Sequence, residues 1–209
     1  MYIKKINLFS KLFIIFNFFF ISFPVFAHHP MEGNVPQSFF QGLISGLAHP
    51  IIGLDHLAFI LSFGVIIMYS NTRLILALSF VLCSLIGVLL TIYNFALPFN
   101  EILIALSVVF AGLMVMKGKK LNILTPVLLG ILAGLFHGFA FGKAVIGAEQ
   151  TPIISYLIGI AAIELLLILG TSYIISKVNF LSLKPRLSGV IFVGVGLILF
   201  IENIEKIIV

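Results

Sequence analysis

Six long apolar stretches dominate the chain, and short polar links separate them. Each stretch has roughly the length, about 20 residues, that an α-helix needs to cross a bilayer. No Gly/Ser linker, low-complexity tract or soluble insertion interrupts the series. The pattern predicts an all-α integral membrane protein, a bundle of six transmembrane helices at residues 42–69, 73–93, 100–116, 122–142, 152–176 and 187–208.

The first 27 residues have the features of a secretory signal peptide. Its basic start, short apolar core and small-x-small cleavage motif lie at Lys4 to Lys11, residues 12–23 and Val25-Phe26-Ala27. The alternative is a first membrane helix that stays uncleaved. Cleavage after Ala27 would leave one six-helix domain, residues 28–209, with His28 and His29 at its new end. These two histidines with the free α-amino group form either an outer capture point for a cation or a flexible terminus.

Basic residues are distributed unevenly over the links. Cytoplasmic loops of membrane proteins carry an excess of Lys and Arg. If the mature N-terminus lies outside, only Lys143 and Lys206 fall on the outer side. The inner links then hold Arg73, Lys117, Lys119, Lys120, Lys177, Lys184 and Arg186. We therefore predict a multi-pass protein of a bacterial cytoplasmic membrane, with both mature ends outside.

Composition supports a membrane protein and excludes several other classes. Hydrophobic residues make up 61% of the chain and charged residues only 9%, against about 25% charged in soluble domains. The net charge of +5 follows the membrane topology, so nucleic acid is not an expected partner. The single Cys83 excludes an intrachain disulfide and a cysteine-rich metal site. The expected partners are the lipid bilayer and a small ligand; no soluble partner is implied, and a homo-oligomer stays open.

The segment from His49 to His56 holds two histidines and the only aspartate of the chain inside an apolar run. Ionisable groups at membrane depth are costly and are functional-site candidates by default. In a straight helix His49 and His56 would lie on one face, about 10 Å apart. Pro50 removes a backbone hydrogen bond, so we expect a distorted helix that lines an internal site. A purely structural role for His49, Asp55 and His56 is the alternative.

Other ionisable residues are expected near the same site. His137 should return to the outer third of the membrane, Glu101 and Glu149 lie near outer helix ends, and Glu164 lies near mid-membrane. We expect these residues and the 49–56 segment to face one cavity that opens outward. The alternatives are an interhelical hydrogen bond for His137, solvated helix ends for Glu101 and Glu149, and an ion pair between Glu164 and Lys143.

Histidines with carboxylates, without a thiolate, suit a borderline divalent cation such as Ni, Co, Cu, Zn or Fe. Uptake requires binding weak enough for release, so we expect the ion as a substrate and no prosthetic group. No HExxH or GxxxxGK[ST] motif occurs, and we predict a transporter and not an enzyme. The alternatives are an intramembrane metal-dependent enzyme and a haem-binding protein with His49 and His137 as axial ligands.

Three segments carry a family resemblance. Residues 49–56 resemble the HPxxGxDH signature of the HupE/UreJ family, residues 136–142 resemble its FHGxAxG signature, and Glu101 precedes a similar IALSV run. The resemblance covers essentially the whole mature chain. It implies a permease for Ni²⁺ or Co²⁺ that serves metalloenzymes or cobalamin synthesis, with metal roles for His49, Asp55, His56, His137 and Glu101. One departure is Lys143, near the position where the family usually has a glutamate after the second signature; the next acid here is Glu149.

Overall fold

The computed structural model describes residues 34–177 and 185–208, and in these ranges the chain is all helical. The predicted signal peptide, with His28 and His29, lies outside the described residues. Seven α-helices and one 3₁₀ turn follow in order: α2 (Phe39–Ile52), α3 (Leu54–Ile67), α4 (Arg73–Ile92), α5 (Asn100–Lys117), α6 (Leu124–Gly142), η1 (Lys143–Val145), α7 (Gln150–Lys177) and α8 (Pro185–Ile208).

Five of these helices, α4 to α8, are long and apolar enough to cross a membrane. The pair α2 and α3 adds a sixth span if its two halves are counted together. The predicted helical segments are confirmed, with boundaries that differ from the observed ones by no more than three residues. The prediction succeeds because a continuous apolar run of bilayer length is a local property of the sequence.

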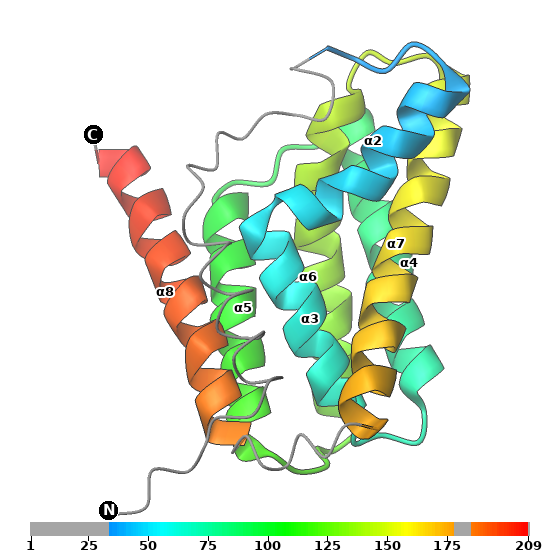
Figure 1. Ribbon diagram of the computed structural model, residues 1–209. Coiled ribbons are helices and arrows are strands. Elements are labelled where there is room, and N and C mark those ends of the chain that lie inside the picture. Colours follow the sequence, from blue (N-terminus) through cyan, green and yellow to red (C-terminus); the bar gives the residue numbers. More distant parts are fainter. Residues whose placement is uncertain (1–33, 178–184, 209) are drawn as a thin grey trace, which may run out of the picture.

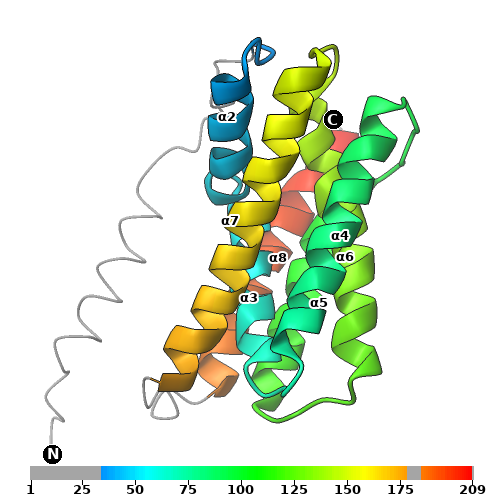
Figure 2. The same cartoon turned by 90° about the vertical axis from the view of Figure 1, so that its right-hand side faces the viewer.

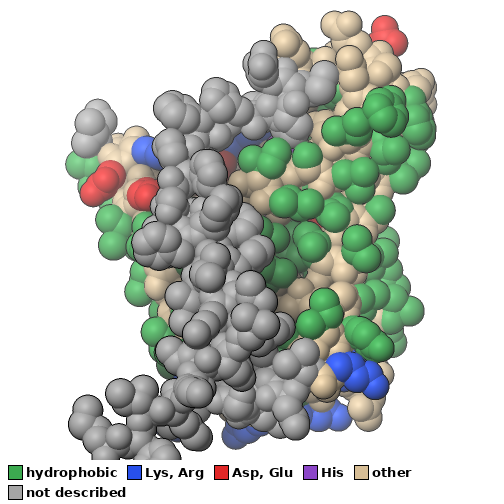
Figure 3. Space-filling model, viewed as in Figure 1, with side chains coloured by type: hydrophobic (Ala, Val, Ile, Leu, Met, Phe, Trp, Pro, Cys, Tyr) green, Lys and Arg blue, Asp and Glu red, His purple; other side chains and the backbone are tan. Residues whose placement is uncertain are grey.

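Large apolar side chains are exposed along the right-hand flank of the molecule in the view of Figure 3. On α4 and α7, for example, Ile75 is 62% exposed and Leu166 is 67% exposed. Soluble monomers rarely expose apolar patches of this extent, because such patches drive association in water. The outer faces of the helices are therefore suited to lipid, and the chain is a multi-pass membrane protein.

Helix α3 lies at the centre of the bundle and contacts each of the other six described α-helices (Figure 1). Most of its residues are buried, and Phe59, Phe63 and Phe80 stack on one another in the core around it. Since α3 begins with Asp55 and His56, the middle of the bundle holds the ionisable segment that the sequence singled out.

The other helices pair closely around α3. Helix α4 runs along α6, α5 along α8, and α2 along α7 (Figure 2). The approach of α4 to α6 depends on small residues. At Gly138 an added Cβ would overlap the backbone carbonyl of Ser84, so only glycine allows this crossing. Small residues thus fix the position of α6, which carries His137.

The two ends of the bundle differ in charge. Links at the end where α3 stops and α4 starts carry only basic residues among the described charges, namely Arg73, Lys117, Lys119, Lys120, Lys177 and Arg186. We call this the basic end. Helix α2 begins and α8 finishes at the opposite end (Figure 1), which also carries every described glutamate except Glu164. The predicted inside and outside assignment stays a prediction.

Candidate metal site

The ionisable segment lies at a break between two helices. Gly53 has extended backbone angles, φ −71° and ψ 113°, and the axes of α2 and α3 meet there at 77°. Pro50 contributes to the break because it has no backbone N–H to donate within α2. A Cβ on Gly53 would collide with the ring of His56, so glycine both ends α2 and makes room for the imidazole. The predicted distortion of this segment is confirmed.

The break brings the two histidines of this segment together. The ring centroids of His49 and His56 are 6.1 Å apart, whereas a straight helix would separate the residues by about 10 Å. Asp55 is adjacent: its Oδ1 lies 3.7 Å from Nε2 of His56 and accepts the backbone N–H of the same residue at 2.8 Å. The bend therefore gathers two imidazoles and one carboxylate.

His137 reaches the same cluster from α6. It is fully buried, and its Nδ1 lies 2.8 Å from Nδ1 of His56. Its Nε2 lies 2.9 Å from the hydroxyl of Ser107 on α5. Both ring nitrogens of His137 are therefore engaged by other side chains. The predicted return of His137 to the neighbourhood of the 49–56 segment is confirmed, and it arrives as a hydrogen-bond partner of His56.

The hydroxyl of Ser107 determines which nitrogens carry protons. That hydroxyl has one proton, which it donates to the Ile104 carbonyl at 2.6 Å. Nε2 of His137 must then be the donor to Ser107. A buried imidazole with no carboxylate partner is neutral, so its Nδ1 accepts a proton from Nδ1 of His56. The remaining nitrogen of His56, Nε2, faces Asp55 at 3.7 Å and is the ring nitrogen that neither His137 nor Ser107 engages.

Tyr156 on α7 acts on His49 in the same way. The tyrosine hydroxyl donates its proton to the Phe141 carbonyl at 2.8 Å and lies 2.9 Å from Nδ1 of His49. His49 Nδ1–H is therefore the donor to Tyr156, and the lone pair of this ring is on Nε2. In metal sites, such second contacts fix the tautomer and orientation of each ligating histidine.

Aromatic rings enclose the cluster. Phe141 packs against His49 and His56 with ring centroids 5.1 Å and 4.4 Å apart. Phe59 packs against His137 at 4.8 Å, and Phe80 lies on another side of that ring at 5.9 Å. These apolar contacts hold the imidazoles in place and lower the local dielectric, which strengthens any charge interaction made there.

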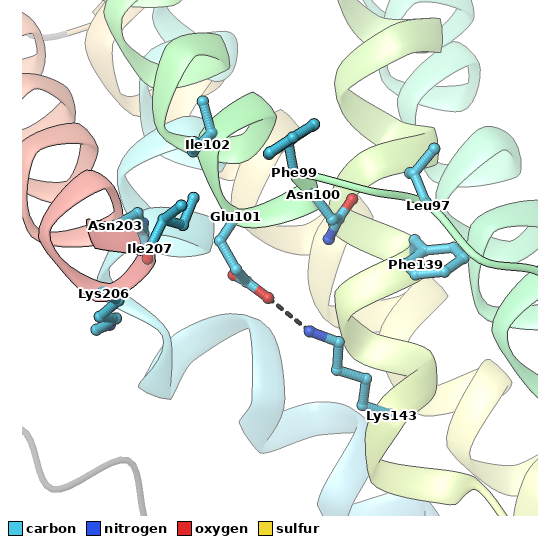
Figure 4. Close-up of a pocket in the computed structure, with 10 residues that line it drawn as sticks. All are labelled: Leu97, Phe99, Asn100, Glu101, Ile102, Phe139, Lys143, Asn203, Lys206 and Ile207. Atoms are coloured by element: carbon cyan, nitrogen blue, oxygen red, sulfur yellow. Dashed lines mark hydrogen bonds and ion pairs between the residues drawn. The ribbon is translucent and has the colours of Figure 1, made fainter. Parts of the chain in front are cut away.

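Glu101 has a different partner. Its carboxylate forms an ion pair with Lys143 at 2.6 Å, and both side chains are about half exposed (Figure 4). The pair lies in a cavity of about 400 Å³ between residues of α5, the α6 end and α8. The alternative ion pair between Lys143 and Glu164 is wrong, because Lys143 lies at the helix end near Glu101 and Glu164 lies inside the bundle.

The remaining two candidate carboxylates, Glu149 and Glu164, lie in different environments. Glu149 is exposed in the link before α7. Glu164 is fully buried on α7, where its Oε1 accepts a hydrogen bond from the Ser84 hydroxyl at 2.8 Å. His49, His56, His137 and Asp55 come together as expected, and the metal roles of these residues and of Glu101, Glu149 and Glu164 all stay predictions.

The cluster is not a preformed metal cage. In residues 34–177 and 185–208, no group of three or more His, Cys, Asp or Glu side chains is arranged to hold an ion. The sequence-based reasoning also missed the hydroxyls of Ser107 and Tyr156. Both are polar groups within apolar spans, and that is the signal by which they could have been found.

Comparison with known proteins identifies the family of this chain. Residues 16–199 match the family described as HupE / UreJ protein. Protein HupE of Rhizobium leguminosarum bv. viciae is 36% identical over 110 residues, which cover 49% of this chain and 54% of the relative. The match thus spans about half of the relative's length. No solved structure matches the chain. The chain belongs to the HupE/UreJ family, a family of membrane permeases associated with nickel and cobalt uptake.

Proposed function

We propose that this protein is a secondary permease that imports Ni²⁺ or Co²⁺ across the cytoplasmic membrane of a bacterium. The observation that carries the proposal is the convergence of His49, Asp55 and His56 at the break between α2 and α3. Membership of a permease family supports transport, and the multi-pass helical fold supplies the path.

The residue types suit this cargo. Imidazole nitrogen is a good ligand for Ni²⁺ and Co²⁺. Nδ1 of His56 and of His49 contacts His137 and Tyr156, so Nε2 is the ligand atom that we propose for each ring. The carboxylate of Asp55 neutralises part of the charge of the ion. This interaction offsets part of the free-energy cost of removing the ion from water. Since the described residues form no complete cage beforehand, the ion has to draw these side chains closer. Such a site binds reversibly, as transport requires.

We assign His137 a positioning role in this site. Its two nitrogens contact His56 and Ser107, so it orients His56 and sets its tautomer without itself offering a lone pair to the ion. Tyr156 does the same for His49. The driving force is the membrane potential, which contributes about 2.3 kcal/mol per charge per 100 mV to the entry of a cation.

Uptake into proteoliposomes tests the proposal. The purified protein is reconstituted with an inside-negative potassium diffusion potential, and radiolabelled Ni²⁺ or Co²⁺ is added outside. We expect potential-dependent uptake that falls by about tenfold or more in His49→Ala, Asp55→Asn and His56→Ala, since each change removes a ligand. Competition by other divalent ions in the same assay identifies the preferred cargo.

Glu205→Gln is the matched control for the loss of one negative charge, because Glu205 is exposed on α8. It should transport like the unaltered protein. Absence of uptake by the unaltered protein would overturn the permease assignment. Uptake that is unchanged in all three site variants would instead move the metal site elsewhere in the bundle.

A further inference from the structure

A second polar site lies deeper in the bundle, at Glu164. This residue is 14 positions from the start of the 28-residue helix α7, and so lies at its midpoint. Its side chain is fully buried, and so is that of its partner Ser84 on α4. Only Oε1 of the carboxyl is used, in the 2.8 Å hydrogen bond from Ser84. Its other oxygen, Oε2, has no hydrogen-bond partner.

A carboxyl oxygen without a hydrogen-bond partner at this depth destabilises the folded state. Leaving a buried polar atom without a partner costs about 1–3 kcal/mol, and more for a charged group. The described part of the chain places no lysine or arginine in an ion pair with Glu164. A glutamine would accept the same hydrogen bond from Ser84 and would carry no negative charge. The fold therefore holds an acid where a neutral side chain would give the same helix contact.

Glu164 belongs to a buried stripe along α7. Tyr156, Ile160, Glu164, Ile168 and Ser172 recur every fourth residue, and each of these side chains is at most 1% exposed. At 1.5 Å per residue, neighbouring polar members are about 12 Å apart along the axis. At 3.6 residues per turn, each step of four residues also turns the stripe by about 40° around the helix, so the stripe winds around α7. The stripe starts at Tyr156, which contacts His49, and it leads toward the basic end of the bundle (Figure 1).

Ser172, at the far side of Glu164, is a second unsatisfied group. Its hydroxyl oxygen is buried and has no hydrogen-bond partner. Helix α7 thus carries three buried polar side chains. Tyr156 contacts the histidine cluster, and Glu164 and Ser172 each have an oxygen atom without a hydrogen-bond partner. Ionisable groups inside membrane proteins commonly mark ion pathways.

This inference rests on the proposed function: we propose that Glu164 is a second cation-binding site. It receives the divalent ion after the ion leaves His49, Asp55 and His56. The carboxylate supplies the negative charge and Oε2 supplies a ligand. The Ser84 hydroxyl holds Oε1 so that Oε2 faces the path. Ser172 offers a further oxygen ligand toward the basic end.

Glu164→Gln separates this role from simple packing, because the amide oxygen still accepts the hydrogen bond from Ser84. With Ni²⁺ or Co²⁺ alone as the probe, we expect the maximal uptake rate in proteoliposomes to fall by about tenfold or more. Binding of the ion to the purified protein in detergent should persist with about the same affinity, because the histidine cluster is intact. Glu164→Asp, which keeps the charge on a shorter side chain, should retain more transport than Glu164→Gln.

Ser84→Ala is the variant that tests packing, since it removes the hydrogen bond and keeps the carboxyl. The transit role predicts a smaller loss of rate than in Glu164→Gln. Unaltered uptake in Glu164→Gln would overturn the proposed second site. Equal losses of uptake and of thermal stability in Glu164→Gln and Ser84→Ala would also overturn it. Loss of all binding in Glu164→Gln would also overturn it, because Glu164 would then belong to the histidine site.

These outcomes are distinguishable from failure of the proposed function. If the unaltered protein takes up neither ion, both the permease assignment and the second cation-binding site are wrong. If the unaltered protein takes up the ion and Glu164→Gln takes it up at the same rate, only the second cation-binding site is overturned. Glu205→Gln is again the control for the loss of one carboxylate at an exposed position.

Discussion

Tyr156 shows how one side chain can organise the metal site without contacting the ion. Its hydroxyl bridges the Phe141 carbonyl and Nδ1 of His49. In Tyr156→Phe, His49 loses the contact that holds its proton on Nδ1, so its lone pair is no longer restricted to Nε2. Second contacts of this kind change metal affinity by about 10–100-fold. We expect the half-saturating concentration for uptake to rise by about tenfold, with a smaller effect on maximal rate.

The matched control is Tyr173→Phe, which removes a hydroxyl from the same helix at a position that is 61% exposed. It should leave the concentration dependence of uptake unchanged. If Tyr156→Phe matches Tyr173→Phe in this measurement, the hydroxyl of Tyr156 does not position His49. A conservative change at Ser107, to alanine, should act on His56 by the same reasoning through His137.

At the scale of helices, glycines set the spacing on which the site depends. Gly138 lies next to His137, and a Cβ there would overlap the Ser84 carbonyl of α4. Gly138→Ala therefore has to push α4 and α6 apart. Overpacking of this kind costs about 1–3 kcal/mol. We expect a lower thermal unfolding midpoint in detergent and weaker uptake, because the same movement disturbs both Ser84 and His137.

Gly170→Ala on α7 provides the comparison, since an added Cβ there meets no atom within 4 Å. In a helix interior, alanine is favoured over glycine by up to about 1 kcal/mol. Gly170→Ala should therefore leave the unfolding midpoint unchanged or raise it. Equal midpoints for the two alanine variants would show that the α4 to α6 contact tolerates the extra methyl group.

Helix positions followed from the sequence, whereas partners between helices did not. Continuous apolar runs locate each helix, and Pro50 with Gly53 locates the break, because both signals are local. The rotation of each helix about its axis is set by packing of many side chains, which no single span records. For that reason the sequence predicted that Glu101 and Glu164 would join the histidines, yet their observed partners are Lys143 and Ser84.

Orientation in the membrane decides from which side the proposed metal site is reached. The histidine cluster lies toward one end of the bundle and Glu164 lies at the midpoint of α7, on the side of the cluster that leads to the basic end. Basic links are expected in the cytoplasm. A basic end in the cytoplasm would therefore place the histidine cluster toward the cell surface.

Single cysteines test this orientation in intact cells. Cys83 is the only cysteine, so Cys83→Ser gives a background that a thiol reagent should not label. On it, Glu149→Cys in the link before α7 should react with a membrane-impermeant maleimide from outside. Lys119→Cys, in the link between α5 and α6, should react only after the cells are permeabilised, because that link lies at the basic end. The reverse labelling pattern would place the histidine cluster toward the cytoplasm. A cation driven inward by the membrane potential would then reach Glu164 before the histidine cluster, which is the reverse of the order that we propose.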